Sequence, residues 1–295
     1  MKKSVASVVL ILVGIFGLSL LTFIGNMKDW AAPIKLVFQS ETKKDSALSK
    51  QLSPLPTLTP TPTPRPLTFA ELNQRFGPCV VAPTLMYHHI QDLEVAHQQG
   101  QASLSVSPEW FRKHMEYLRD RQYSVISMEN LVQFFDQGTT LPKKSVLITF
   151  DDGYTDFATN ALPILKELGY PATLFAPTGL MDNPGYLTWV EIGNLGSSFL
   201  VANHTWSHQS AYTSKEVMAR EIAVADQQLK DRGLNNPKVF AYPYGSDSMP
   251  AETELRQQGY LLGFTTQHSL TQCQKKRLQL PRIRVGNAPL SAYGL

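Results

Sequence analysis

Two adjacent carboxylates, Asp151 and Asp152, have the residue types and position that first suggest chemistry. They follow the apolar, β-branched run at residues 145–150 and precede Gly153, a pattern typical of a buried strand that ends in a turn. In α/β proteins, sites are built at the C-terminal ends of parallel strands, so the pair could supply one metal ligand and one general base. Alternatively, both acids only cap exposed amides of a turn before a helix.

Two histidines could complete a metal site. His204 and His208 follow the strand-like segment 199–203, and their spacing of four residues predicts that they share one face of a helical turn. With an oxygen of Asp151 or Asp152 they would form a His-His-Asp site with open coordination positions, which suits a hydrolytic metal. Two histidines at this spacing are often only structural, but their position two strands after Asp-Asp-Gly favours the metal site.

The composition limits the class of protein. With 295 residues, 43% of them hydrophobic and 17% charged, the chain can bury one large domain with appendages. The net charge of +3 is small and the basic residues are scattered, so nucleic acid is not an expected partner. Cys79 and Cys273 belong to no CxxC pair, which argues against a zinc knuckle or redox motif. A disulfide between them and two buried thiols remain alternatives.

The N-terminal segment, residues 1–27, is predicted to be a membrane anchor. Residues 4–25 carry no charge and follow Lys2 and Lys3, and a run of this length can cross a hydrocarbon core of about 30 Å. The preceding lysines predict a cytoplasmic N-terminus and an exported remainder. The alternative is a secretory signal cleaved near Ala31 and Ala32, which would release the protein into the same compartment.

Residues 28–67 are predicted to be a linker. The first part is polar, and residues 52–66 form a Pro-Thr tract. Proline at nearly every second position removes backbone donors and favours extended polyproline II, so the tract is a semi-rigid spacer. It would hold the following domain away from a membrane, whereas a role as a proline-motif ligand is the weaker alternative.

Residues 68–295 are predicted to form an α/β domain. Repeated alternation of strand-like and helix-like segments favours a regular or distorted (β/α) barrel over an open doubly wound sheet, because no glycine-rich dinucleotide turn follows a strand. The strands are expected near residues 80–86, 123–127, 145–150, 172–176, 199–203, 238–242, 261–265 and 281–285.

Capping signals predict where several helices begin and end. Ser107 caps a helix with Pro108 at its first position, and Asn160 is expected to cap another that ends before Gly169. Residues 213–216 read as a capping box for a third helix. Its apolar stripe is predicted to be core rather than cofactor contacts: Met218, Ile222, Ala225 and Leu229.

Three motifs, at residues 149–153, 204–208 and 242–245, together resemble the NodB-homology polysaccharide deacetylases, carbohydrate esterase family 4. The segments 107–111, 163–173 and 187–189 extend the resemblance over nearly the whole domain. It implies a distorted (β/α) barrel and a divalent cation, with zinc favoured and cobalt or nickel as alternatives. It also implies that Asp152, His204 and His208 bind the cation and that Asp151 is the general base.

The same resemblance implies how an N-acetyl group would be attacked and bound. A divalent cation lowers the pKa of its water toward 7 and polarises the amide carbonyl, and a backbone amide near Tyr244 would help to hold the oxyanion. The residues expected to bind substrate are Pro243, Tyr244, Trp189 and Tyr87. For Trp189, packing under the barrel rim is an equal alternative.

Two departures from the family pattern require substitutes. The arginine that usually precedes the third motif is replaced by Ala241, and Arg282 is the candidate to orient Asp151 instead. The usual Leu-x-His motif is missing after residue 245, whereas residues 85–90 resemble the subgroup that acts on poly-N-acetylglucosamine. His88 is therefore expected to protonate the leaving amine, since its ordinary pKa lies near 6.5. His89 should point to the opposite face, and the alternative is that both are structural.

Together with the predicted anchor, the resemblance implies a membrane-anchored, extracytoplasmic, metal-dependent deacetylase. Its substrate would be the N-acetylglucosamine residues of a cell-surface or extracellular polysaccharide, either a β-1,6-linked exopolysaccharide or peptidoglycan. Two alternatives remain. One is an esterase that removes O-acetyl groups from xylan-like material with the same site. The other is a domain that binds glycan without turnover, which the missing arginine would explain.

Overall fold

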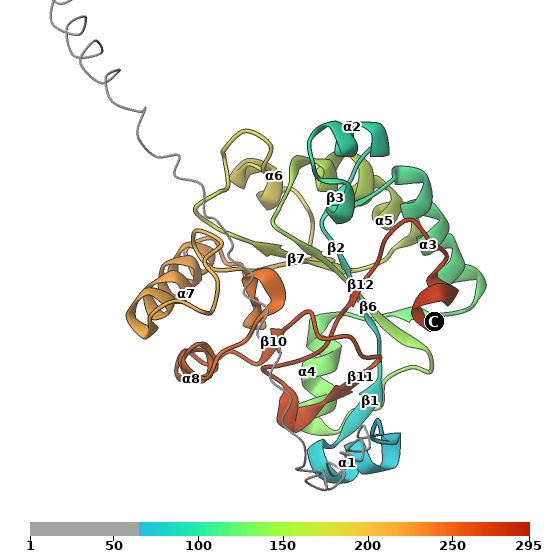
Figure 1. The fold of residues 1–295 in the computed structure, drawn as a ribbon, viewed down its shortest axis with the longest axis vertical. Helices are drawn as coiled ribbons and strands as arrows, with labels where there is room; N and C mark the ends of the chain where they lie inside the picture. Colours follow the sequence, from blue (N-terminus) through green and yellow to red (C-terminus); the bar gives the residue numbers. More distant parts are fainter. Residues whose placement is uncertain (1–64) are drawn as a thin grey trace, which may run out of the picture. The chain divides into compact units, whose positions relative to one another are not determined.

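A curled sheet of parallel strands lies at the centre of the fold (Figure 1). The computed structural model describes residues 65–295, which belong to one compact unit. The strand order is β10-β9-β8-β7-β6-β2-β12, and β5 pairs with β6. The strands are β2 (Thr84–Tyr87), β5 (Ser124–Val125), β6 (Ser145–Asp151), β7 (Ala172–Ala176), β8 (Phe199–Asn203), β9 (Val239–Ala241), β10 (Leu262–Phe264) and β12 (Ile283–Arg284).

The last part of the chain connects the two edges of this sheet. Leu280 forms a parallel bridge with Phe264 of β10, and four residues later Arg284 of β12 pairs with Met86 of β2. Because one short segment contacts strands at both ends of the order, the sheet curls as a (β/α) barrel does. The predicted α/β class and curled parallel architecture are thus confirmed.

Two further pairs of short strands lie outside the main sheet. β1 (Cys79–Val81) pairs antiparallel with β11 (Thr271–Cys273), and β3 (His89–Ile90) pairs parallel with β4 (Ser105–Val106). The predicted strand 80–86 is therefore two strands, separated at Pro83, which cannot donate to a ladder. A disulfide joins Cys79 to Cys273, which decides between the two alternatives for these cysteines.

Helices surround the sheet (Figure 1). They are α1 (Phe69–Phe76), α2 (Leu93–Gln98), α3 (Pro108–Asp120), α4 (Met128–Gln137), α5 (Leu162–Leu168), α6 (Trp189–Gly193), α7 (Lys215–Lys230) and α8 (Met249–Gln257). Among residues 65–295 no helix is long and apolar enough to cross a membrane. The predicted anchor, residues 1–27, and nearly all of the predicted linker, residues 28–67, lie outside the described residues.

Two of the predicted helix signals are confirmed. The Ser107 side chain accepts from the Trp110 backbone amide at the start of α3, and Gly169 ends α5 in the left-handed conformation with φ 66°. The apolar stripe of α7 is also buried as expected, with Met218, Ile222, Ala225 and Leu229 in the core.

Two other helix starts were predicted wrongly. Asn160 lies inside the π-helical turn Phe157–Ala161. Its side-chain Nδ2 donates to the Ile90 carbonyl at 2.6 Å, so the side chain does not cap a helix. Ser214 caps α7 alone. Because α7 begins at Lys215, Glu216 is the second helical residue, one position short of the place from which a carboxylate closes a capping box.

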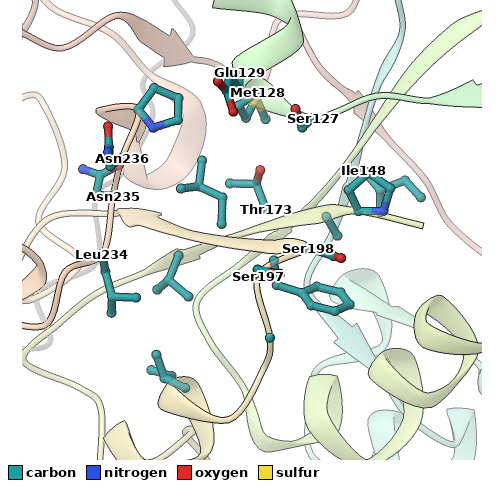
Figure 2. Close-up of a pocket in the computed structure, with 18 of the residues that line it drawn as sticks. Ser127, Met128, Glu129, Ile148, Thr173, Ser197, Ser198, Leu234, Asn235 and Asn236 are labelled. Carbon is teal, nitrogen blue, oxygen red and sulfur yellow. The ribbon is translucent and has the colours of Figure 1, made fainter. Parts of the chain in front are cut away.

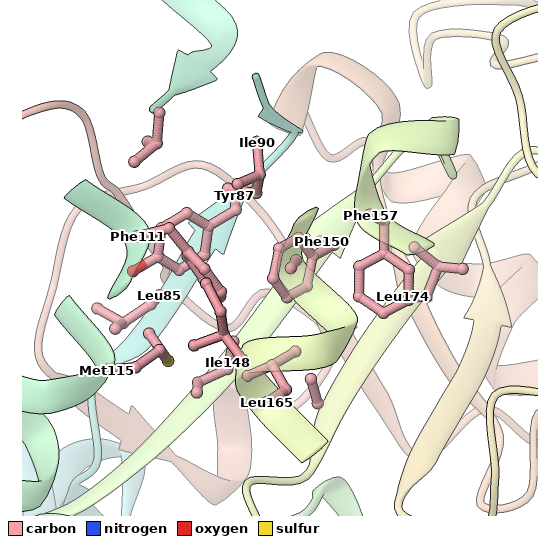
Figure 3. Close-up of a cluster of buried hydrophobic side chains, with 14 of the residues drawn as sticks. Leu85, Tyr87, Ile90, Phe111, Met115, Ile148, Phe150, Phe157, Leu165 and Leu174 are labelled. Atoms are coloured by element: carbon pink, nitrogen blue, oxygen red, sulfur yellow. The ribbon is translucent and has the colours of Figure 1, made fainter. Parts of the chain in front are cut away.

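Aromatic packing beneath the sheet fixes the strand that carries the carboxylates (Figure 3). Phe150 of β6 stacks on Tyr87 at 5.3 Å between ring centroids and meets Phe157 edge-on at 4.8 Å. Phe111 of α3 contacts Tyr87 edge-on at 5.1 Å. These rings are fully buried, so β6 is held firmly just before Asp151.

A cavity of about 450 Å³ lies near the N-terminal ends of β7 and β8 (Figure 2). Its lining includes Ser127, Thr173, Ser197 and Asn235. The carboxylates of the first motif instead follow the C-terminal end of β6. The cavity is therefore separate from the candidate chemistry.

Candidate metal centre and active site

A sharp turn at the end of β6 separates the two carboxylates. Asp151 is the last residue of the strand, and Asp152 and Gly153 both have φ of 72°. Few non-glycine residues adopt this conformation, and a Cβ on Gly153 would come within 2.9 Å of Met181 Cε. The turn gives adjacent acids different neighbours, so they can perform different tasks.

The two histidines lie on an irregular loop after β8, not on the helical turn that their spacing predicted. Thr205 and His208 have φ of 67° and 61°. The Thr205 amide donates to Asn203 Oδ1 at 2.7 Å, and the Gly179 amide donates to the Trp206 carbonyl at 2.7 Å. Backbone strain held by surrounding hydrogen bonds is typical of functional sites. The loop still brings both imidazoles to Asp152.

A buried carboxylate from α7 also holds this loop. Glu221 Oε2 accepts from the Ser207 amide at 2.7 Å, and Glu221 Oε1 accepts from Ser207 Oγ at 2.8 Å. Ser207 immediately precedes His208, and Glu221 is 6% exposed. Glu221 was not predicted from the sequence, although a charge between Met218 and Ile222 on the apolar stripe was a signal that could have revealed it.

Asp152, His204 and His208 have the geometry of ligands around one cation. Their ligand atoms lie within 4.8 Å of one another. Asp152 Oδ1 is 3.4 Å from His204 Nε2 and 3.1 Å from His208 Nε2. Two ligands each about 2.0–2.1 Å from a tetrahedral zinc ion would be about 3.3 Å apart.

Two features of the candidate ligand atoms fit a bound cation. Within the described part of the chain, no donor reaches the buried Asp152 Oδ1 with hydrogen-bond geometry. His204 Nδ1 lies 2.8 Å from the Ala241 carbonyl, and because a carbonyl only accepts, Nδ1 carries the proton. The lone pair of Nε2 therefore faces Asp152, the arrangement usual for a metal-binding histidine.

The charges of the site favour an ionised Asp152. Burial would raise the pKa of Asp152, but the contacts with His204 and His208 outweigh burial and hold it well below its usual range. Burial would likewise lower the pKa of His204, yet Asp152 and Asp151 raise it. The group thus has the negative charge that attracts a cation, and a proton on His204 competes with that cation.

Asp151 is paired with an arginine from the far end of the chain. Arg282 donates from both terminal nitrogens to the two carboxylate oxygens, at 2.6 and 2.7 Å. Its Nε donates to the Thr265 carbonyl at 3.0 Å. Burial would raise the pKa of Asp151, but the charge of Arg282, with smaller contributions from His204 and His88, lowers it. Asp151 is therefore an oriented, ionised carboxylate.

The two histidines after β2 face different partners. His88 Nε2 lies 4.0 Å from Asp151 Oδ2, and its side chain is 14% exposed. Burial lowers the pKa of His88, only partly opposed by Asp151 and Asp152. His89 Nδ1 instead contacts Asp156 Oδ2 at 2.6 Å. The structure thus places His88, and not His89, beside the predicted base.

Most of the candidate site lies in a region that matches a known protein family. Residues 138–263 match the family described as polysaccharide deacetylase. The chain thus carries a match to the polysaccharide deacetylase domain at these residues. The matched region contains the carboxylate pair and both histidines, whereas His88 and Arg282 lie outside it.

Relatives and solved structures cover most of this chain. The poly-beta-1,6-N-acetyl-D-glucosamine N-deacetylase of Escherichia coli K12 is 26% identical over 251 residues, which cover 70% of this chain and 36% of that protein. The chain thus spans about a third of that relative. The enzyme of the same name from Staphylococcus epidermidis is 23% identical over 62% of this chain and 68% of its own length.

Two solved structures have the same fold. The Streptococcus pyogenes deacetylase PplD in complex with acetate is 28% identical, with a TM-score of 0.65 over 70% of this chain and 92% of its own. IcaB from Ammonifex degensii is 24% identical, with a TM-score of 0.62 over 72% of this chain and 94% of its own.

In the deacetylase domain, the third motif lies next to the metal ligands. Pro243–Gly245 form a short 3-10 turn in which Tyr244 has φ of 62°. Tyr244 is 70% exposed, and its ring lies 4.7 Å from the His208 ring. Pro243 is buried beneath it. Tyr244 is therefore accessible beside the site, and Pro243 shapes the turn.

The other two residues predicted to bind substrate, Tyr87 and Trp189, are placed differently. Tyr87 is 1% exposed, and its hydroxyl contacts His114 Nδ1 at 3.1 Å inside the core. The prediction that Tyr87 binds substrate is therefore wrong. The Trp189 ring is covered by the Arg232 guanidinium at 4.0 Å, and it packs against the core. These contacts agree with the alternative prediction, in which Trp189 is a packing residue.

Two tyrosines near the metal ligands were not predicted. Tyr154 follows Gly153, and its ring lies 5.3 Å from the ring of Tyr186. Burial raises the pKa of Tyr186, and the charges of Asp152 and Tyr244 raise it further. Tyr186 directly precedes the predicted Leu-Thr-Trp segment, but a lone tyrosine there carries no distinguishing sequence signal.

Proposed function

We propose that this chain is a metal-dependent N-deacetylase that removes acetyl groups from N-acetylglucosamine residues of a cell-surface or extracellular polysaccharide. The observation that carries the proposal is the arrangement of Asp152, His204 and His208 beside an Asp151 that Arg282 holds by two hydrogen bonds. A ligand set for one cation next to an oriented carboxylate suits the hydrolysis of an amide.

Asp152, His204 and His208 would hold the cation, and zinc is the proposed ion because two histidines and one carboxylate suit its tetrahedral preference. Cobalt and nickel are alternatives that the same donor atoms accept. When bound, the cation supplies Lewis acidity that polarises the acetyl carbonyl and acidifies water.

Asp151 accepts the proton of the attacking water in the proposed reaction. His88 Nε2, 4.0 Å from Asp151 Oδ2, donates a proton to the nitrogen as the carbon–nitrogen bond breaks. One water is consumed, and acetate and a free amine are formed. The backbone amide near Tyr244 is proposed to bind the developing oxyanion.

The proposed substrate is supported by the printed activities of relatives. Those from Escherichia coli and Staphylococcus epidermidis are named as deacetylases of poly-beta-1,6-N-acetyl-D-glucosamine. An N-acetylated polysaccharide of this kind is proposed here, with peptidoglycan as the second candidate.

Arg282 argues against a domain that only binds glycan. That alternative was motivated by Ala241 at the usual arginine position, but the contact of Arg282 with Asp151 supplies the missing partner from the segment that leads into β12. An O-acetyl esterase acting on xylan would need the same groups, so the choice of substrate has to be tested directly.

We further propose a location outside the cytoplasm. Residues 1–27 would anchor the chain, residues 28–67 would form the spacer, and residues 68–295 would be the catalytic domain. The disulfide between Cys79 and Cys273 supports an oxidising compartment. If the N-terminal segment is cleaved, the domain would be secreted into that same compartment.

The decisive experiment measures acetate release from N-acetylglucosamine oligomers and, in parallel, from O-acetylated xylan. We expect release from the oligomers, loss of release with a chelator and recovery with zinc. Release from xylan alone would favour the esterase. Binding of the oligomer with no release in the presence of zinc would favour the binding domain.

A further inference from the structure

Three neighbouring aromatic rings lie beside the candidate metal ligands, and the roles assigned above leave them unused. The His89 ring stacks on Tyr154 with centroids 3.6 Å apart and planes 15° apart. The Tyr186 ring lies 5.3 Å from Tyr154 at 31°. We propose that Tyr186, supported by Tyr154, forms a subsite for a pyranose ring of the glycan next to the reacting N-acetyl group. The identity of this ligand rests on the proposed function.

The His89 ring, which supports Tyr154, is fixed by a buried contact with Asp156. His89 is 5% exposed, and its Nδ1 contacts Asp156 Oδ2 at 2.6 Å. The other oxygen of Asp156 accepts from the Ile90 amide at 2.9 Å. Because the imidazole cannot shift without breaking these contacts, it is a rigid support for one face of Tyr154.

Backbone contacts join the two tyrosines to the carboxylate turn. Tyr154 and Tyr186 form an antiparallel bridge. The Leu187 amide donates to the Gly153 carbonyl at 2.8 Å, and the Thr155 amide donates to the Gly185 carbonyl at 3.0 Å. Tyr186 is therefore held at a set position relative to Asp152, which directly precedes Gly153.

The position of Tyr186 beside the metal ligands suits a role in binding. The next residue, Leu187, donates to the carbonyl of Gly153 in the carboxylate turn, and the exposed Tyr244 ring lies 4.7 Å from the His208 ring. The Tyr186 side chain is half-buried, so part of it remains accessible. Preformed, partly exposed side chains bind at a low entropic cost because they are already ordered.

The chemistry of the two tyrosines matches a sugar ring. A pyranose has faces of apolar C–H groups and edges of hydroxyls, and tyrosine offers an apolar ring with one hydroxyl. Neutral phenols also suit a polymer of N-acetylglucosamine, which carries no charge before deacetylation. The subsite would therefore favour a pyranose over an acetyl compound without a sugar ring.

The test compares Tyr186→Ala and Tyr186→Phe on substrates with and without a sugar ring, using the zinc-loaded protein. For an N-acetylglucosamine pentamer, we expect Tyr186→Ala to weaken binding and raise KM about tenfold, the size of one aromatic contact. Tyr186→Phe should keep most of the affinity. Hydrolysis of 4-nitrophenyl acetate should be unchanged in both variants. Phe69→Ala, an exposed aromatic on α1, is the control.

Two results would overturn the subsite. One is pentamer affinity in Tyr186→Ala equal to that of the unaltered protein. The other is an equal loss on the pentamer and on 4-nitrophenyl acetate, which would show a general effect on the site. Pentamer binding measured by calorimetry separates this inference from the proposed function. Binding that depends on Tyr186 without acetate release would retain the subsite and refute the deacetylase.

Discussion

Arg282, directly before β12, and Asp151, at the end of β6, form a buried, bidentate ion pair. The guanidinium donates to both carboxylate oxygens at 2.6 and 2.7 Å, and the two residues are 1% and 3% exposed. In a buried pair, loss of either partner leaves a charge without compensation. This pair therefore couples the stability of the fold to the ionisation of the proposed base.

Replacing Arg282 by Met should damage both stability and activity. We expect the free energy of unfolding to fall by about 3–5 kcal/mol and kcat to fall by about 100-fold or more. Chemical denaturation and acetate release measure the two effects. The matched control is Arg112→Met, because Arg112 makes a similar two-armed contact with Glu167 on the exposed surface. Its removal should cost about 1 kcal/mol or less.

The pH profile of Arg282→Met tests whether Arg282 lowers the pKa of Asp151. In the unaltered protein the pKa of Asp151 is lowered because Arg282, together with His204 and His88, outweighs burial, so the base stays ionised as the pH falls. Without Arg282 burial would dominate and raise this pKa. The acid limb of the kcat/KM profile should then move to higher pH. An unmoved limb would show that Asp151 is not the titrating base.

Cation binding should weaken as the pH falls. The pKa of His204 is raised because Asp152 and Asp151 outweigh burial. A proton therefore occupies its imidazole at higher pH than in a free histidine, and this proton competes with the cation. Calorimetric titration with zinc between about pH 5.5 and 8 should show affinity that rises with pH. His204→Ala should abolish tight binding, whereas His97→Ala, on α2, should leave it unchanged.

His88 and His89 should differ in the property that each controls. His88→Ala is expected to lower kcat by about 100-fold or more while zinc content stays the same, because His88 faces Asp151. His89→Ala should mainly lower the melting temperature, since it removes the buried partner of Asp156 Oδ2. Metal analysis, turnover and thermal denaturation of both variants separate these effects. An unaffected turnover in His88→Ala would refute its role as the acid.

Glu221 should control metal affinity without touching substrate. Its carboxylate holds Ser207 next to His208, and loss of a group that supports a ligand typically costs about 10–100-fold in metal affinity. We expect Glu221→Ala to weaken zinc binding by that factor in a calorimetric titration. Glu216→Ala, on the exposed first turn of the same helix, is the matched control. Equal affinities in the two variants would contradict the positioning role.

Local patterns determined several elements of this protein. The Ser107 cap and the burial of β6 were predictable because hydrogen bonds to neighbouring amides and burial of consecutive apolar residues act over a few residues. The candidate metal ligands were found from their types and order along the chain, because both pairs follow strands whose C-terminal ends meet at one edge.

Other features depend on contacts between distant segments. Arg282 reaches Asp151 only because β12 adds to the sheet beside β2, and Cys79 faces Cys273 only because β1 pairs with β11. The sequence predicted that Tyr87 binds substrate, but aromatic packing directs its side chain into the core. The spacing of His204 and His208 predicted a helical turn, whereas hydrogen bonds that Asn203 and Glu221 accept hold an irregular loop instead. Local propensity thus determined the elements and candidate ligands of this chain, while tertiary packing decided which side chains meet, because those contacts join residues that the sequence separates.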